Sequence, residues 1–439
     1  MKSFVFAISS IIAGMSFATA EEGRGLRLGP VTVERDRALT EKVLDFQEGL
    51  TSDVPYLLKR YEAGELKTNS IYVGGLIRGG LYKEQTNTAG KFPILSRFPF
   101  QHDSDTDNTE ALIQNAAVTF TGNFGKWVTA FAQIEHSEVF YRPDQDNVQL
   151  REAYVIFGNL EQSPFYAAVG RKTVDFGQFD TFTPFTHSVN QHYFWTLSDD
   201  PVVEVGYIGD TFRISGTLIN GSRQMRVAYS DNDDVFGNFA VKAEKVFTLD
   251  RIGARARLSA SYLHDTIYNN NFTAHTEEAI IRAGPPNAPA FPPVFFQERN
   301  GLMNVAALLN FENIDVEAEY TRSTDKWPAT TMSALTGESY DDSPVLQAIT
   351  LQGRYNFDLM GKDANFSAVL SRGIFGPDDT EFDLADQHSA ALEWSVLPFL
   401  NLGAEYVYNN GFQPFVGIQE ASDTGVESHT FIIGGDARF

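Results

Sequence analysis

Apolar and polar residues alternate along most of the chain. The segment 253–263 reads GARARLSASYL, so Ala254 and Leu258 share one parity while Arg255 and Arg257 share the other. Successive side chains of a β-strand point to opposite faces, so each such segment has one apolar and one polar face. The pattern predicts an all-β chain of antiparallel strands.

The connections between these segments are sorted by length. Links after even-numbered strands are tight turns such as Gly209-Asp210, whereas links after odd-numbered strands are mostly long, such as 266–299, with 142–146 as the exception. Long loops at one end and tight turns at the other are typical of a transmembrane antiparallel β-barrel with both termini in the periplasm. A soluble sandwich has no reason to sort its loops in this way. We expect about sixteen strands, at roughly 70–82, 112–121, 127–141, 147–158, 164–173, 201–208, 211–220, 237–247, 252–265, 300–311, 314–323, 345–357, 364–372, 385–397, 400–409 and 426–439.

Aromatic residues gather beside the predicted tight turns. Trp127, Phe165, Phe212 and Phe399 are examples. Rings at the lipid–water boundary form such a girdle in membrane barrels, whereas ordinary core aromatics would show no bias towards one end of the strands. The distribution therefore favours a barrel that spans a membrane.

The start of the chain reads as a secretory signal. Lys2 supplies a positive charge, an apolar run follows, and Ala18-Thr19-Ala20 gives the small-x-small cleavage pattern. We expect residues 1–20 to be a signal peptide, 21–69 to be a periplasmic segment, and 70–439 to be the barrel.

The segment before the barrel has a different texture. From Asp36 to Leu66 the apolar residues recur at roughly helical spacing. Two structures fit this pattern: one or two short helices tucked into the barrel mouth, or a tether without fixed structure.

Composition narrows the function classes. The formal charge of −23 disfavours nucleic-acid binding, which needs clustered Lys and Arg. Cysteine is absent, and His187 and His192 do not have a recognised ligand spacing, so no metal site is expected. Neither a nucleophile elbow nor a glycine-rich nucleotide loop occurs, so we expect neither an enzyme nor a cofactor.

The last strand ends on an aromatic residue. Phe431, Ile433, Gly435 and Ala437 alternate towards the terminal Phe439. This ending resembles the signal that the outer-membrane barrel assembly machinery recognises, and that machinery is therefore an expected partner.

A stretch in the middle of the first half carries a family resemblance. The run REAYVIFGN at 151–159 is followed by Val169-Gly170-Arg171, by Phe176-Gly177-Gln178-Phe179 and by Asp200-Pro201. These motifs resemble outer-membrane porins of the LbtU-like siderophore-porin group, and more loosely the phosphate- and carbohydrate-selective porins. The resemblance covers about 50 residues, and the stretch 202–206 departs from the pattern. It implies uptake of an iron–siderophore or another small solute without an energised plug.

The loop after the fifth strand, 174–200, is the candidate constriction. Sixteen strands enclose a lumen wide enough for water, and the many charges of inward parity favour a wet interior. In sixteen-strand porins the loop at this position commonly folds inward, and the aromatic content here suits packing inside a barrel. Acids facing arginines would create a transverse field that selects solutes by charge. The candidate lining residues are Asp175, Asp180, His187 and His192 on the loop, opposite Arg151, Arg171, Arg255 and Arg257 on the wall.

The sequence thus predicts a passive channel in contact with outer-membrane lipid. Small hydrophilic solutes, iron–siderophores among them, are the expected cargo. The alternative is a surface-exposed barrel that acts as an adhesin or antigen without solute flux. Trimers are common among sixteen-strand porins, so a homotrimer is a further expectation, although no residue marks its interface.

Overall fold

The computed structural model describes residues 26–28, 30–95, 105–138, 148–196, 198, 201–220, 237–266, 300–326, 345–374, 384–414 and 422–439. The predicted signal peptide and much of the predicted long loops lie outside these residues.

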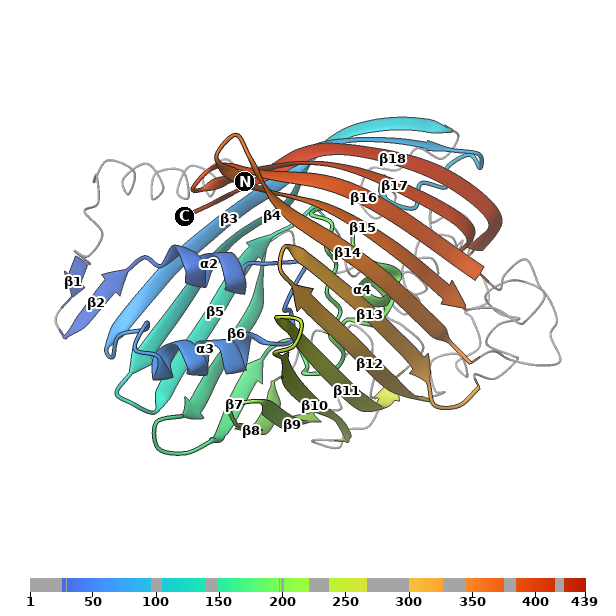
Figure 1. Ribbon diagram of the computed structural model, residues 1–439. Helices are drawn as coiled ribbons and strands as arrows, with labels where there is room; N and C mark the ends of the chain where they lie inside the picture. Colours follow the sequence, from blue (N-terminus) through green and yellow to red (C-terminus); the bar gives the residue numbers. More distant parts are fainter. Residues whose placement is uncertain are drawn as a thin grey trace, which may run out of the picture.

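Within the described ranges, sixteen antiparallel strands close into one barrel, as the sequence predicted (Figure 1). Each strand pairs with its neighbours in chain order, and β18 pairs with β3 to close the ring, with Gly434 opposite Gly80. The strands are β3 (Ser70–Thr86), β4 (Asp107–Phe124), β5 (Val128–His136), β6 (Val148–Gly158), β7 (Phe165–Arg171), β8 (Val202–Ile208), β9 (Phe212–Ile219), β10 (Asn238–Leu249), β11 (Ala254–Thr266), β12 (Asn300–Phe311), β13 (Ile314–Ser323), β14 (Gln347–Leu359), β15 (Lys362–Ile374), β16 (Leu384–Leu397), β17 (Leu400–Pro414) and β18 (Ser422–Arg438).

Several strands run further towards the long loops than the sequence predicted. β3 continues to Thr86, and β4 begins already at Asp107. The added residues 83–86 read KEQT and are polar on both faces. A strand that projects beyond the lipid has no apolar face, so alternation cannot mark its end.

The outer surface of the barrel is apolar. Large side chains of the outward parity are exposed, with Ile433 at 69% and Phe165 at 64%. Trp127, Phe212 and Phe399 are likewise exposed beside the short turns, where the sequence predicted a girdle. Lipid supplies the solvent for such a surface, and closure of the sheet satisfies every strand edge. The chain therefore belongs in a bacterial outer membrane.

Two helices of the N-terminal segment lie in the barrel mouth at the end with the short turns, α2 (Arg37–Val43) and α3 (Asp53–Glu62) (Figure 1). Their apolar faces pack against inward-facing wall residues such as Tyr154 and Ile156, in one buried cluster that includes Leu39, Leu57 and Leu58. Of the two structures predicted for this segment, short helices or a tether without fixed structure, the helices are therefore confirmed. No helix among the described residues is long and apolar enough to cross a membrane.

Helix α2 sits over the seam where the barrel closes. The backbone of Phe439 exchanges two hydrogen bonds with Gly75 of β3, each 3.0 Å. Thr40 Oγ1 of α2 donates to the backbone oxygen of Phe439 at 3.4 Å, and Arg438 donates to the backbone oxygen of Glu41 at 3.3 Å. Two short strands, β1 (Leu26–Leu28) and β2 (Val31–Glu34), extend the sheet beside the start of β3. The first and last barrel strands are thus tied to the same helix.

Candidate pore constriction

The loop after β7 crosses the inside of the barrel. It contains the short helix α4 (Val189–Phe194), whose N-terminal Ser188 side chain accepts a hydrogen bond from the Gln191 amide at 3.2 Å (Figure 1). Nearly all described side chains of the loop are buried. The loop therefore occupies the lumen and is not displayed in water.

Polar wall residues hold this loop by its backbone. Side-chain oxygens from five strands accept hydrogen bonds from loop amides at 2.8–3.0 Å. Glu319 accepts two of them, and the other acceptors accept one each. Inward polar residues that looked like the lining of a wet lumen are thus largely buried against the loop. The pairs are Gly177 with Ser261, Gln178 and Phe179 with Glu319, Phe182 with Gln352, Phe185 with Glu405, and Val189 with Ser371.

Asp175 begins the loop inside a buried charge cluster. Its carboxylate lies 2.6 Å from Arg213, 3.2 Å from Lys242 and 2.6 Å from the hydroxyl of Ser215. Burial alone would raise the pKa of Asp175, but Arg213, Lys242 and Lys172 outweigh it and hold the pKa below its ordinary range. Asp175 is therefore an anchor in its ionised form.

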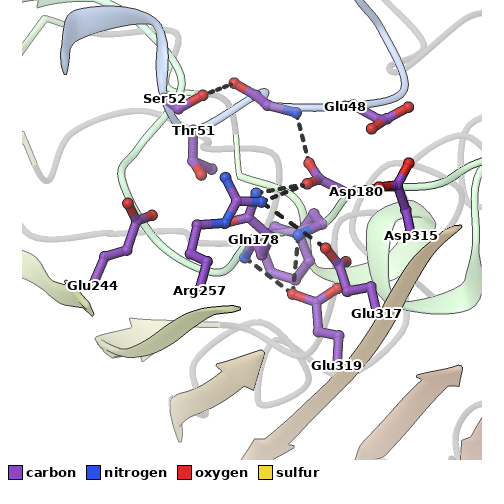
Figure 2. Close-up of polar contacts among 12 residues, drawn as sticks. Glu48, Thr51, Ser52, Gln178, Asp180, Glu244, Arg257, Asp315, Glu317 and Glu319 are labelled. Atoms are coloured by element: carbon purple, nitrogen blue, oxygen red, sulfur yellow. Dashed lines mark hydrogen bonds and ion pairs between the residues drawn. The ribbon is translucent and has the colours of Figure 1, made fainter. Parts of the chain in front are cut away.

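Asp180 lies at the centre of a second cluster, shown in Figure 2. It pairs with Arg257 at 3.1 Å and accepts hydrogen bonds from the Gln178 side chain at 2.7 Å and the Gly49 amide at 2.6 Å. Glu317 faces the same arginine at 4.0 Å. This is the one juxtaposition, among the eight predicted residues, of a loop acid with a predicted wall arginine.

The tip between α2 and α3, residues 45–51, contacts the loop and is part of the candidate constriction. The Gln47 side chain donates to the backbone oxygens of Thr183 and Thr186 at 2.6 and 3.1 Å. Glu48 pairs with Arg354 of β14, which also holds Asp315 at 2.9 Å. The N-terminal tip and the loop thus bind each other across the lumen. Helical spacing predicted the helices, but no sequence signal marked the tip as part of the pore.

Arg151 has a different role from the one predicted. Its guanidinium pairs with Glu135 at 2.8 Å and lies over the rings of Phe46 and Trp195, at 5.3 and 4.7 Å from their centroids. A register shift in the β5–β6 ladder pairs Gln133 with Glu152 and Ile134 with Leu150, so the ladder skips position 151. Among the described residues its ion pair is with a wall acid, and it joins the wall, the tip and the loop.

The remaining predicted residues lie apart from the acid clusters. Arg171 is half-buried and donates to the backbone oxygen of Arg151 at 3.0 Å, and Arg255 is exposed. Neither forms an ion pair with Asp175 or Asp180, and their place in the pore lining stays a prediction. Arg213 and Lys242, which the sequence reasoning missed, hold Asp175 instead.

The two loop histidines pack against rings. His187 meets Trp195 edge-on at 6.2 Å, and His192 meets Tyr193 in the same manner at 4.9 Å. Among the residues that the structure describes, no group of three His, Cys, Asp or Glu side chains could hold a metal ion.

A polar cavity of about 750 Å³ opens beneath the constriction, which we call the vestibule. The α2 helix and the tip form one side of it. The turn residue Asn313 and the ends of β14 to β18 form the other side, and loop residues 181–184 and Arg78 of β3 also line it. Four cationic and seven acidic side chains line it. The vestibule is therefore a charged chamber with an acidic excess.

Comparison with known proteins supports the fold. A family model described as "Protein of unknown function (DUF3573)" matches residues 62–236, less than half of the chain, and no curated protein matches the sequence. Among solved structures, OmpF of Salmonella typhi in complex with daunomycin gives a TM-score of 0.51 at 12% identity, covering 84% of this chain and 97% of that one. OprB of Pseudomonas putida gives 0.49 at 10% identity (90% and 99% covered), and OmpT of Vibrio cholerae gives 0.48 at 11% (84% and 97% covered). At such identities the likeness to OmpF shows the fold alone: this chain is a porin-type barrel.

Proposed function

We propose that the protein is a passive outer-membrane channel for small hydrophilic solutes, and not an enzyme. The observation that carries this proposal is the polar internal loop, held across the lumen by wall residues above a charged vestibule. A sixteen-strand barrel is too wide for its wall side chains to fill. A purely structural barrel would need no such charged interior, because buried charges are costly unless paired.

Purified protein in a planar bilayer should produce stepwise conductance. The double variant Glu319→Ala, Glu405→Ala removes the acceptors of three loop amides, so the loop should loosen and the steps should become larger or noisier. A matched control replaces two exposed acids of the periplasmic turns, Asp210 and Asp250, by Ala and should leave the steps unchanged.

Absence of conductance in the wild type would overturn the channel proposal and favour the adhesin hypothesis instead. Normal steps in the Glu319→Ala, Glu405→Ala variant would show that the loop does not set the pore. Cross-linking of the purified protein tests the homotrimer, which is also part of the proposal.

Iron–siderophore uptake is a narrower form of the proposal. It is supported by the resemblance of the 151–201 motifs to the LbtU-like porins. A deletion strain should then grow poorly when iron is restricted and recover when the gene is restored. Equal growth of the deletion and parent strains in low iron would discard this form and leave the general channel standing.

A further inference from the structure

Arg78 of β3 is buried in the lining of the vestibule and, among the described residues, forms no ion pair, although Asp436 lies opposite it in the β18–β3 register. It is 2% exposed, and within the described part of the chain its partner is the ring of Phe46, whose centroid lies 5.6 Å from the guanidinium carbon. Its Nη1 has no hydrogen-bond acceptor among these residues. A guanidinium has five N–H donors, and leaving one buried without an acceptor costs free energy. The guanidinium therefore keeps a buried donor that no described residue satisfies.

Gln47, the residue after Phe46, has a buried acceptor without a donor. Its amide nitrogen is used in the bonds to Thr183 and Thr186, but its Oε1 has no donor among the described residues. Gln47 is 4% exposed and lines the vestibule together with Arg78. A buried donor and a buried acceptor thus stand without partners in one cavity.

The other vestibule cations are already engaged. Arg37 pairs with Glu41 and Arg438 with Asp436, each at 2.5 Å, and Lys42 donates to the backbone oxygen of Glu48 at 3.2 Å. A simple anion would therefore reach Arg78 only through a chamber with more acids than bases. A simple cation would gain nothing from Arg78. A solute with one negative and one positive group would supply an acceptor to Arg78 and a donor to Gln47 Oε1.

We propose that Arg78 and Gln47 form a binding subsite for small zwitterions that carry a carboxylate and an ammonium group, such as free amino acids. The carboxylate accepts from the Arg78 guanidinium, in the geometry that guanidinium offers to planar anions. The ammonium donates to Gln47 Oε1 and faces the acids of the vestibule. This inference rests on the proposed channel function and specifies which solutes the channel prefers.

Uptake into proteoliposomes tests the subsite, with the membrane potential clamped at zero. Labelled L-alanine, L-lactate and L-alaninamide are matched in size and differ in charge, and arabinose reports the open pore. The wild type should take up alanine faster than lactate and alaninamide. Arg78→Gln should lower the alanine rate about tenfold, in line with loss of a charge-assisted hydrogen bond, and should leave arabinose unchanged. Arg78→Lys should retain part of the preference.

The controls separate binding from folding. Arg78 has no hydrogen bond or ion pair to lose within the described residues, so Arg78→Gln should keep the heat-modifiable gel mobility of a folded barrel. Arg372→Gln, which removes an exposed arginine paired with Asp386, should leave all four rates unchanged. Equal uptake of alanine, lactate and alaninamide by the wild type, or an unchanged preference in Arg78→Gln, overturns the subsite while arabinose flux upholds the channel. No flux of any solute, arabinose included, overturns the channel and the subsite together.

Discussion

Charges inside this barrel are paired between segments that lie far apart in the sequence. Asp175 of the loop is 1% exposed and meets Arg213 of β9 and Lys242 of β10. Removing one partner of a buried ion pair leaves the others uncompensated in a low-dielectric interior, which is more costly than losing an exposed pair. The cluster therefore fixes where the loop begins.

Asp175→Asn should destabilise the protein by about 3–5 kcal/mol, because buried Lys242 would lose its ion-pair partner and Arg213 would keep only Glu244, at 3.5 Å. Chemical unfolding in lipid vesicles, followed by tryptophan fluorescence, measures the change. Asp107→Asn, which removes an exposed partner of Lys83, is the control and should leave the transition in place. If Asp175→Asn unfolds at the same denaturant concentration as the control, the cluster adds nothing to stability.

Glu48 should make docking of the tip depend on pH. Burial raises the pKa of Glu48 to about 7 against the opposing effect of Arg354, and Asp45 and Asp180 add to the rise. An acid with a raised pKa binds its proton more tightly when docked. The stabilisation of docking by the protonated Glu48 is therefore complete at pH values below 4.5, the ordinary pKa of a glutamate. It is lost as the pH rises through 7. The tip should therefore be held more firmly at pH 5 than at pH 8.

A spin label measures this, since the chain has no native cysteine. With the label at Glu62→Cys, on the exposed end of α3, the mobile fraction should rise from pH 5 to pH 8. Glu48→Gln should reduce the rise. It should not abolish it, because burial and Glu152 also raise the pKa of Asp53 and give a change of the same sign. Equal mobile fractions at both pH values in the wild type would refute the pH dependence.

The candidate site could be predicted from the sequence only in part. Loop position and aromatic content identified 174–200, and Asp180 pairs with Arg257, one residue from each of the two predicted sets. Parity says which wall residues face inward, but it does not say which strand lies across the lumen. Arg213 and Lys242 were missed for that reason, and a local register shift at Arg151 is invisible in an alternating pattern.

At the scale of elements, close packing of α2 on β3 depends on a glycine. A Cβ added at Gly74 would lie 2.3 Å from Thr40 Oγ1, the hydroxyl that also reaches the Phe439 oxygen. Side chains cannot approach so closely, so a larger residue at this position must move the helix or rotate Thr40 away from its partner.

Gly74→Val should loosen α2 and expose the N-terminal segment to protease several-fold faster. Gly216→Val in β9 is the matched control, because an added Cβ there meets nothing within 4 Å. Limited proteolysis of the folded protein, with cleavage mapped by mass spectrometry, compares the two. If both variants are cleaved at the wild-type rate, α2 is not held through this contact.

At the scale of the whole molecule, the sequence was sufficient for the barrel and insufficient for its contents. Alternation, sorted loop lengths and aromatic positions depend on lipid outside and on a closed sheet, which act on every strand alike. The interior is filled by segments from outside the strand pattern. Its apolar wall residues, such as Phe131 and Ile156, oppose α2 and α3 and break the expected polar parity.

The acidic excess of the vestibule predicts cation preference. In a bilayer with a potassium chloride gradient, the reversal potential should have the same sign as the potassium equilibrium potential. The reason is that seven acidic and four basic side chains line the vestibule. Replacing Asp363 and Glu393 by Asn and Gln should shift the potential towards zero. A reversal potential with the sign for chloride in the wild type would contradict this expectation.

The position of α2 also has a consequence for biogenesis. The surface that α2 binds combines β3, the first strand of the barrel, with Arg438 and Phe439 at the end of β18, the last barrel strand. That surface does not exist until the ring is complete. Docking of the N-terminal segment must therefore be a late event in assembly, and a protease-resistant N-terminus reports that an individual barrel has finished closing.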